Sequence, residues 1–270
     1  MKITVKGIGA KTLDGPISLQ ELAKEYQDNF SSPITAAVVD NNLRELTYVL
    51  DNDATVEFLD MSSEVGMSIY LRSLVFLFAK ACYDIFPDCK VLVEHSLGDG
   101  LYCEIVREEP LSEDDVGTIE NRMRQLVEKD IPIKKNKIPL KEAMALFQKA
   151  GMEDKVRVLR HRKSDFLNVY EMDGTYDYLY GYMLPSTGYL KWFGLKFYLP
   201  GIILQHPNRS NPTQIAEYHE QPKLASIFRE SDRWAHILGI PDVGALNEHI
   251  ISGKSGDVIR VAEALHEKKI

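Results

Sequence analysis

The segment from residue 68 to residue 83 is apolar on every face of the helix that it would form. One face is made by Leu71, Leu74, Val75, Phe78 and Cys82, and the other faces carry Ile69, Phe76, Leu77 and Ala79. A helix that is apolar all round has to be covered by other elements from several sides. No apolar run approaches the ~20 residues that a membrane span requires. The sequence therefore predicts a buried core helix in a soluble protein, with no membrane contact.

Bulk composition argues against several classes of protein. The chain has 270 residues, enough for two domains or one large one, and its 32 basic and 40 acidic side chains give a net charge of −8. This charge disfavours RNA as a partner, because phosphate binding requires clustered Lys and Arg. Cys82, Cys89 and Cys103 are odd in number and lack the close C-x-x-C spacing of a metal or redox site. We interpret them as reduced thiols in a cytoplasmic protein.

The first 60 residues alternate strands with one helix. Ser18 and Glu21 stand three residues apart, a capping-box pattern that predicts a helix start. Strands are expected at residues 2–5, 11–13, 35–39, 45–49 and 55–59. A hairpin, one helix and further strands in so short a segment are typical of a β-grasp domain.

The rest of the chain mixes helices with largely antiparallel strands. We expect a strand hairpin at residues 90–94 and 101–106, a helix after the cap Ser112, and another between Pro139 and Gly151. Further strands are expected at residues 156–159, 167–170 and 202–205, and helices at 222–234, 243–251 and from 255 to the end. The predicted fold class is α+β. The expected domains cover residues 1–60, 67–220 and 221–270, with a linker at 60–66 and a helical third segment.

A tyrosine-rich stretch runs from Tyr176 to Tyr189 and contains the turn sequence Pro-Ser-Thr-Gly at residues 185–188. Proline presets φ and glycine accepts positive φ, so this sequence favours a tight turn. The aromatic flanks at residues 177–183 and 189–198 predict two paired strands. Their tyrosines either seal a sheet edge or line a pocket, and the pattern alone leaves both interpretations open.

Two resemblances to known families build on these patterns. Residues 1–60, with Ala36 to Asn42 before the last paired strands, resemble a TGS domain, the small N-terminal module of threonyl-tRNA synthetases and some GTPases. Residues 68–203 resemble the second, editing-type (SAD) domain of threonyl- and alanyl-tRNA synthetases. The long helix, residues 83–90, residues 100–105 and the tyrosine-rich stretch carry this second resemblance. It implies a fold that in the synthetases hydrolyses mischarged aminoacyl esters.

The chemical groups of an editing site are replaced in this chain. In editing domains the long helix carries His-x-x-x-His and the tyrosine-rich position carries Cys-x-x-x-His. By this resemblance these positions fall on Arg72, Phe76, Leu179 and Met183, none of which can hold a metal as its counterpart does. We therefore predict no metal site and no catalytic residues. Tyr102, Lys155 and Asp177 match a tyrosine, a lysine and an aspartate of the editing site, which implies a cleft that kept its shape.

A TGS–SAD pair without these histidines also resembles the N-terminal half of bacterial nucleoside kinases of the uridine kinase type. Residues 180–189, 197–201 and 207–212 carry this resemblance. It implies that ATP and Mg²⁺ belong only to a kinase domain that would follow a helix such as residues 258–266. Gly253-Lys254-Ser255 is no P-loop, because Glu248 stands where the first glycine is required.

Two functions follow from these observations. The preferred one is a non-catalytic regulatory region of a nucleoside kinase-like protein that binds a nucleoside or nucleotide or docks its own kinase domain. The alternative is a hydrolase of aminoacyl-tRNA esters that uses Asp177, Lys155 and His95 as acid–base groups. The candidate ligand-binding residues are Arg72, Glu94, His95, Tyr102, Lys155, Asp177, Tyr180, Tyr182 and Thr187. The sequence leaves the oligomeric state open.

Overall fold

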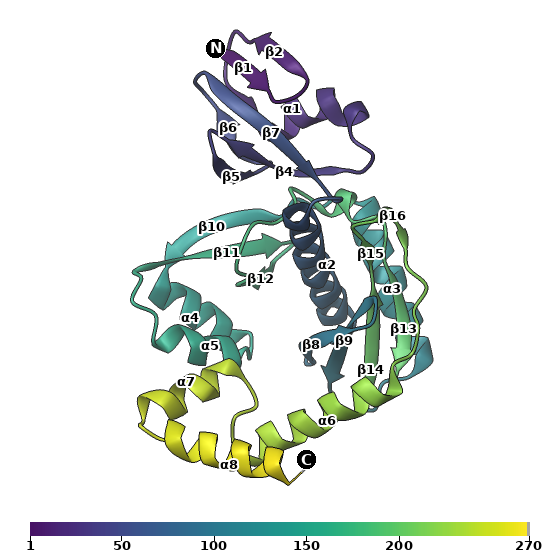
Figure 1. Cartoon of the computed structure of the whole chain (residues 1–270), viewed down its shortest axis with the longest axis vertical. Coiled ribbons are helices and arrows are strands. Elements are labelled where there is room, and N and C mark those ends of the chain that lie inside the picture. Colours follow the sequence, from purple (N-terminus) through teal and green to yellow (C-terminus); the bar gives the residue numbers. More distant parts are fainter. Residues whose placement is uncertain (269–270) are drawn as a thin grey trace. The chain divides into compact units, whose positions relative to one another are not determined.

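A computed structural model describes residues 1–268 and has the expected α+β class (Figure 1). The chain forms two compact units. The first unit contains Met1–Lys135 and Tyr170–Glu220, and the second contains Asn136–Val169 and the segment from Gln221 onward. The following paragraphs describe each unit by itself.

The first unit opens with a five-stranded sheet in the order β2-β1-β7-β4-β5. These strands are β1 (Lys2–Val5), β2 (Gly9–Thr12), β4 (Ile34–Val39), β5 (Asn42–Glu45) and β7 (Ala54–Asp60). The first strand runs parallel to β7, and the neighbouring pairs are antiparallel. Helix α1 (Leu19–Tyr26) buries Leu19 and Leu22 in the core that this sheet contributes to. This is the β-grasp arrangement that the sequence predicts.

The start of α1 and the edge strands differ in how well they were predicted. The capping box of Ser18 and Glu21 is present, with both reciprocal hydrogen bonds. The strand expected at residues 45–49 is wrong, because β5 ends at Glu45. The chain then turns, and β6 (Val49–Leu50) pairs with β3 (Ile17–Ser18) in a separate two-stranded sheet. The short 3₁₀ helix η1 (Gln27–Asn29) follows α1.

Helix α2 (Glu64–Ile85) is the buried core helix that the apolar pattern predicts, and it extends further at both ends. The linker expected at residues 60–66 is largely absent, because Asp60 still belongs to β7 and Ser63 caps α2 by accepting a hydrogen bond from the Gly66 amide. Among the helices of residues 1–268, α2 alone is long and apolar enough to cross a membrane, contrary to the expectation that no segment reaches that length. Most of it is buried inside the protein, as in a core helix of a soluble protein.

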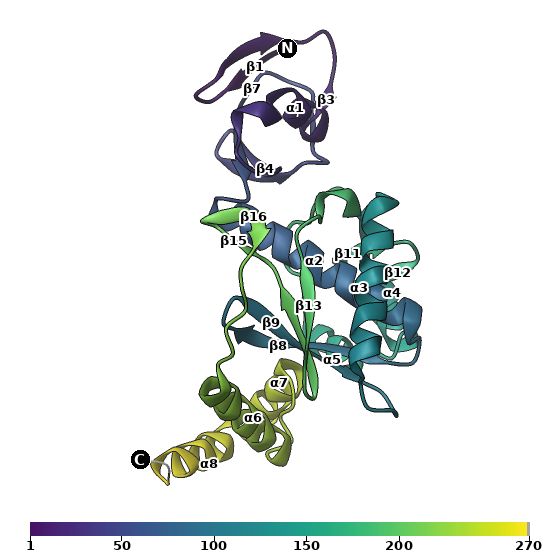
Figure 2. The same cartoon turned by 90° about the vertical axis from the view of Figure 1, so that its right-hand side faces the viewer.

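A four-stranded antiparallel sheet, in the order β13-β14-β9-β8, packs beside α2. Its strands are β8 (Lys90–Leu97), β9 (Gly100–Val106), β13 (Gly194–Tyr198) and β14 (Gly201–Gln205). Cys103, Ile202 and Leu204 join the core of α2, and α3 (Glu113–Glu128) packs against both α2 and β13 (Figure 2). The hairpin predicted at residues 90–94 and 101–106 is confirmed, as is the capped start of α3 at Ser112. A short hairpin of β15 (Pro207–Asn208) and β16 (Asn211–Ile215) follows.

The predicted pairing of residues 177–183 with 189–198 is wrong. Only β12 (Thr175–Asp177) forms at the start of this stretch, and it pairs with β11 (Phe166–Met172), whereas β13 pairs with β14. Residues 178–186 have no strand, and Thr187–Tyr189 form the 3₁₀ helix η2. The backbone here bonds to the loop after α3 instead of to a neighbouring strand: the Thr187 amide donates to Ile131 O (2.9 Å), and the Ile133 amide donates to Pro185 O (2.8 Å).

The second unit is mostly helical. It contains α4 (Leu140–Lys149), α5 (Glu153–Arg160), α6 (Pro222–Ile237), α7 (Val243–Ile251) and α8 (Ser255–Glu267), and β10 (Lys134–Pro139) begins in the first unit and continues into it. The strand expected at residues 156–159 is helical, because Val156 and Leu159 are buried at helical spacing and Arg157 pairs with Asp242 of α7. The Gly253-Lys254-Ser255 sequence joins α7 to α8, and Gly253 has a φ of +78°.

Candidate functional site

The four positions aligned with the editing groups lie where α2 meets residues 178–186. Phe76 is fully buried, Met183 is 2% exposed, and Leu179 packs against the same core. The Ser73 hydroxyl of α2 accepts a hydrogen bond from the Leu184 amide (2.9 Å). These contacts fix the irregular segment to the helix and fill the space between them with apolar side chains.

Arg72 occupies the remaining position at this junction. Its Nη1 donates to the carbonyl oxygen of Tyr182 (2.7 Å). Gly181 has a φ of +117°, and a Cβ placed on it would lie 2.7 Å from the Arg72 guanidinium carbon. Burial lowers the pKa of Arg72, but a guanidinium stays protonated in proteins. Arg72 therefore acts as a cationic anchor for the backbone of the segment and supplies no base.

A polar group made by Glu45, Lys135, Tyr170 and Tyr182 adjoins Arg72. The Tyr170 hydroxyl lies 3.0 Å from Gly181 O and 3.2 Å from the Glu45 carboxylate. The Lys135 ammonium is 3.1 Å from that carboxylate and 4.7 Å from the centroid of the Tyr182 ring. Burial and the charge of Glu45 raise the pKa of Tyr170, so its hydroxyl stays protonated. These contacts connect strand β5 to the segment after β12.

The structure brings His95 and Tyr102 together across the β8–β9 pair, with ring centroids 5.3 Å apart. Tyr102 is 4% exposed and donates to the Glu104 carboxylate (2.6 Å). Tyr198 of β13, which sequence reasoning missed, stands 6.0 Å from the Tyr102 ring. In this sheet the imidazole of His95 thus lies beside the phenol ring of Tyr102, whose hydroxyl is bound to the Glu104 carboxylate.

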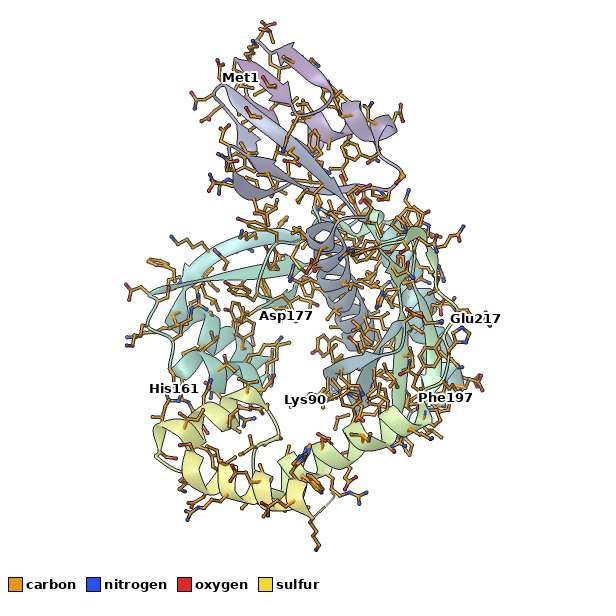
Figure 3. The ribbon with its side chains drawn as sticks, viewed as in Figure 1. Met1, Lys90, His161, Asp177, Phe197 and Glu217 are labelled. Atoms are coloured by element: carbon orange, nitrogen blue, oxygen red, sulfur yellow. The ribbon has the colours of Figure 1, made fainter. Side chains whose placement is uncertain are left out.

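The other predicted residues are dispersed. Asp177 ends β12, where it is buried and accepts a hydrogen bond from the Tyr178 amide (2.5 Å) (Figure 3). Tyr180 is 87% exposed. Thr187 is fully buried, and its hydroxyl donates to Leu126 O (2.6 Å). Lys155 lies in the second unit on α5, with its ammonium 5.8 Å from the Phe147 ring centroid.

Glu94 precedes His95 on β8, at the point where the β8–β9 register shifts. Within residues 1–268, no three His, Cys, Asp or Glu side chains gather in a way that could hold a metal ion. The three cysteines are buried and free, and burial raises the pKa of Cys89 to about 11. Burial also raises the pKa of Cys82 and of Cys103. Their thiols are thus neutral near pH 7 and poorly nucleophilic.

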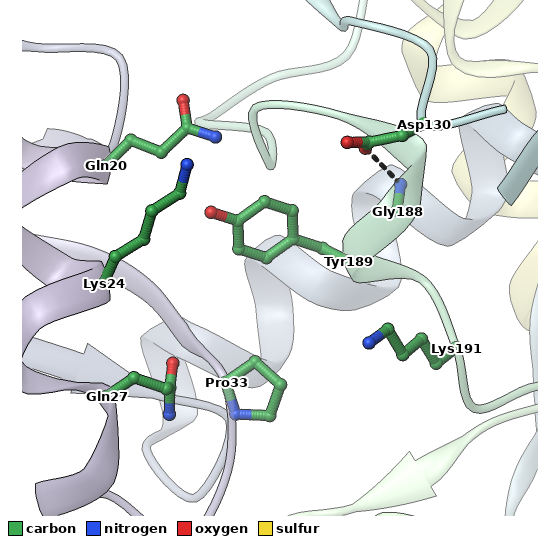
Figure 4. A pocket seen from close by; sticks show the side chains of 8 residues that line it. All are labelled: Gln20, Lys24, Gln27, Pro33, Asp130, Gly188, Tyr189 and Lys191. Carbon is green, nitrogen blue, oxygen red and sulfur yellow. Dashed lines mark hydrogen bonds between the residues drawn. The ribbon is translucent and has the colours of Figure 1, made fainter. Parts of the chain in front are cut away.

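A pocket that the sequence analysis missed lies between α1 and the loop that contains η2 (Figure 4). Its volume is about 360 Å³. It is lined by Gln20, Lys24, Gln27, Pro33, Asp130, Gly188, Tyr189 and Lys191. Of these, Tyr189 and Gly188 belong to the tyrosine-rich stretch, and nothing in the sequence pattern connects them with α1.

Tyr189 is the central side chain of this pocket. Among the described residues it is the one partly buried hydrophobic side chain that packs against both core clusters, that of the β-grasp sheet and that of α2. Burial raises the pKa of its hydroxyl. Asp130 Oδ1 accepts from the Gly188 amide (3.0 Å) and from the Ser186 hydroxyl.

Comparison with known proteins finds relatives but no family model that matches. The threonine--tRNA ligase of Coxiella burnetii is 27% identical over 186 residues, which is 68% of this chain and 29% of that protein. The threonine--tRNA ligase of Fusobacterium nucleatum is 32% identical over 178 residues, or 65% of this chain and 29% of that protein. That of Thiobacillus denitrificans is 27% identical over 190 residues.

These relatives support the resemblance to the TGS and editing-like region of threonyl-tRNA synthetases over about 70% of the chain. The matches cover less than a third of the length of these synthetases. The relatives named above are tRNA ligases, so the expected nucleoside kinase parent and its ATP-dependent activity find no support in them.

Proposed function

We propose that this chain is a non-hydrolytic binding region related to the editing region of threonyl-tRNA synthetases, and that it recognises the acceptor end of a tRNA. The observation that carries the proposal is the replacement of all four editing groups by side chains that hold the fold together. Arg72 binds the Tyr182 carbonyl, and Phe76 and Met183 are core residues. The relatives named threonine--tRNA ligase support the choice of tRNA as partner.

Hydrolysis of an aminoacyl ester needs a base or a metal to activate water. Apolar side chains at three of the four positions supply neither, and the protonated Arg72 cannot accept a proton. An exposed aromatic ring next to this junction can still stack a terminal base. Tyr180 is such a ring, since it is 87% exposed and is next to Gly181 in sequence.

The test measures binding and hydrolysis in the same preparation. We expect a tRNA acceptor-stem minihelix to bind, while a mischarged seryl-tRNA is deacylated no faster than in buffer. Tyr180→Ala should weaken minihelix binding by roughly 1–3 kcal/mol, the value typical of base–aromatic stacking. Phe166→Ala, which removes a ring that is 48% exposed in the second unit, is the matched control. Failure of the minihelix to bind at low salt would refute the proposal.

A second candidate, hydrolysis of aminoacyl-tRNA esters by a rearranged site, is favoured by the same relatives and by the pairing of His95 with Tyr102. In this mechanism the imidazole would act as the general base for water, with the phenol held by Glu104. It predicts deacylation that is lost in His95→Ala. Deacylation that survives in His95→Ala would exclude this mechanism.

We further propose a cytoplasmic location, because Cys82, Cys89 and Cys103 are free thiols buried in the core. A regulatory role beside a nucleoside kinase domain lacks a supporting relative among those described above. The minihelix experiment separates the two roles, since a purely kinase-docking module would not bind the RNA end.

A further inference from the structure

The pocket around Tyr189 is walled by two segments that are more than 100 positions apart in sequence. Gln20, Lys24 and Gln27 come from α1 and η1, whereas Asp130, Gly188, Tyr189 and Lys191 come from the loop after α3 and the region of η2 (Figure 4). A volume of about 360 Å³ falls within the range of small-molecule sites. The pocket thus has room for a ligand of nucleotide size.

Two of its polar side chains are already used by the protein. The Gln27 amide donates to Ser32 O (2.9 Å) and accepts from the Ile34 amide (3.1 Å). Asp130 Oδ1 holds Gly188 and Ser186, which leaves its second carboxylate oxygen as an acceptor toward the pocket.

The two lysines differ from these groups. Neither Lys24 nor Lys191 forms an ion pair with a carboxylate of residues 1–268. Lys24 contributes to lowering the pKa of Glu21, which hydrogen bonds with Ser18 lower more strongly. The lysine side chains extend from opposite walls on either side of Tyr189 (Figure 4). In a chain with a net charge of −8, the pocket lining holds two ammonium groups against the single carboxylate of Asp130, and this local excess of positive charge indicates a place for an anion.

We propose that this pocket binds a phosphate monoester attached to a hydroxyl-bearing group such as ribose. A phosphate monoester carries about −1.5 to −2 charges at neutral pH, which two lysines acting as point charges can balance. The Asp130 carboxylate repels a ligand whose only polar groups are anionic. It can, however, accept a hydrogen bond from a sugar hydroxyl. The inference does not rest on the function proposed above, because it concerns residues outside the editing-like junction.

Binding in this pocket would stabilise the packing of Tyr189 against the two cores. The ligand contacts α1 on one side and the η2 region on the other, so it binds only when both segments are in place. A ligand that binds only the folded protein raises its melting temperature. Calorimetry and thermal unfolding therefore report on the same event.

The first experiment titrates the chain with AMP, adenosine and inorganic phosphate by isothermal calorimetry. We expect AMP to bind, inorganic phosphate to bind more weakly, and adenosine to bind at least about tenfold more weakly than AMP. A 5′-phosphorylated RNA minihelix, compared with its dephosphorylated form, distinguishes a free nucleotide from a phosphate at an RNA end. Equal binding of AMP and adenosine overturns the proposal, as does the absence of binding by both AMP and the phosphorylated RNA.

Variants locate the site. Lys191→Ala and Lys24→Ala should each weaken binding of the phosphate monoester about tenfold, whether AMP or phosphorylated RNA carries it. Lys90→Ala removes an exposed lysine at the start of β8, outside the pocket, and should leave binding unchanged. Tyr189→Phe keeps the ring in both cores and removes only the hydroxyl, so its melting temperature controls for folding. Binding that is equal in Lys191→Ala, Lys24→Ala and wild type would refute the assignment even if AMP binds elsewhere.

Discussion

The editing-like junction and the pocket around Tyr189 lie in the same unit but use their side chains differently. At the junction, Phe76 and Met183 are core residues and Arg72 binds a backbone carbonyl, so its own side chains fill the space. In the pocket, Lys24 and Lys191 have no carboxylate partner among the described residues, and a cavity remains between them. The two regions differ in whether the protein's own side chains fill the space between the segments or leave a cavity there.

The largest effect is expected from Phe76→Ala. This substitution removes a fully buried ring from α2, and loss of the packing should lower the free energy of unfolding by about 3–5 kcal/mol. Urea denaturation monitored by circular dichroism measures the change. Tyr180→Ala is the matched control, because that ring is 87% exposed and its loss should cost no more than about 0.5 kcal/mol. A small effect of Phe76→Ala would mean that the junction is an open site.

A smaller effect is expected from Gly181→Ala, at about 1–3 kcal/mol. The substitution adds a Cβ at a φ of +117° and only 2.7 Å from the guanidinium carbon of Arg72. Part of this cost is steric and should disappear when Arg72 is also changed to alanine. A double-mutant cycle in urea therefore measures the coupling of Gly181 with Arg72. Simple additivity of the two substitutions would contradict the anchor role of Arg72.

Alkaline pH should weaken the junction through Tyr170. Burial and Glu45 raise the pKa of its hydroxyl above the ordinary tyrosine value of about 10, so in the unfolded chain this hydroxyl loses its proton first as the pH rises. The contribution of Tyr170 to stability is thus constant below about pH 10 and falls above it. Urea midpoints between pH 8 and pH 11 should decline less in Tyr170→Phe than in the wild type. Parallel curves for the two proteins would show that Tyr170 titrates normally in the fold.

The smallest effect on folding is expected in the pocket. Lys24→Ala and Lys191→Ala remove exposed side chains, and each should change the free energy of unfolding by no more than about 0.5 kcal/mol. The same denaturation experiment checks this. A loss of several kcal/mol in either variant would mean that the lysine holds the fold, and the contrast between the two regions would disappear.

Local patterns predicted the elements whose signals lie within one turn or one strand. The capping box at Ser18, the helix cap at Ser112 and the strands of the β8–β9 hairpin are present as expected. Residues 156–159 were misassigned because the β-branched Val156 and Val158 alternate along the chain as in a strand. The buried residues are instead Val156 and Leu159, at helical spacing, and the ion pair of Arg157 with Asp242 joins residues 85 positions apart in sequence. The strand predicted at residues 45–49 was wrong because the chain turns after Glu45, and Val49 and Leu50 then pair with β3 in a different sheet.

The candidate site was predicted less well than the fold. The resemblance to editing domains places Arg72, Phe76, Leu179 and Met183 at the positions of the editing groups, and this assignment stays a prediction. The contact of His95 with Tyr102 was not predicted, because the expected strand ended at residue 94 whereas β8 continues to Leu97. Tyr198 was missed because β13 joins that sheet through β14. The pocket residues were missed entirely, since α1 and η2 carry no shared signal along the chain.

The sequence by itself determined the α+β class and the buried helix α2. These depend on side-chain type and on spacing of three or four residues, which the chain carries locally. Only the tertiary structure decided that residues 178–186 bond to α2 and to the loop after α3 instead of forming a hairpin. It alone placed Lys24 and Lys191 around one cavity. Both outcomes depend on contacts between distant segments, and the free energy of such contacts comes from packing that no local pattern records.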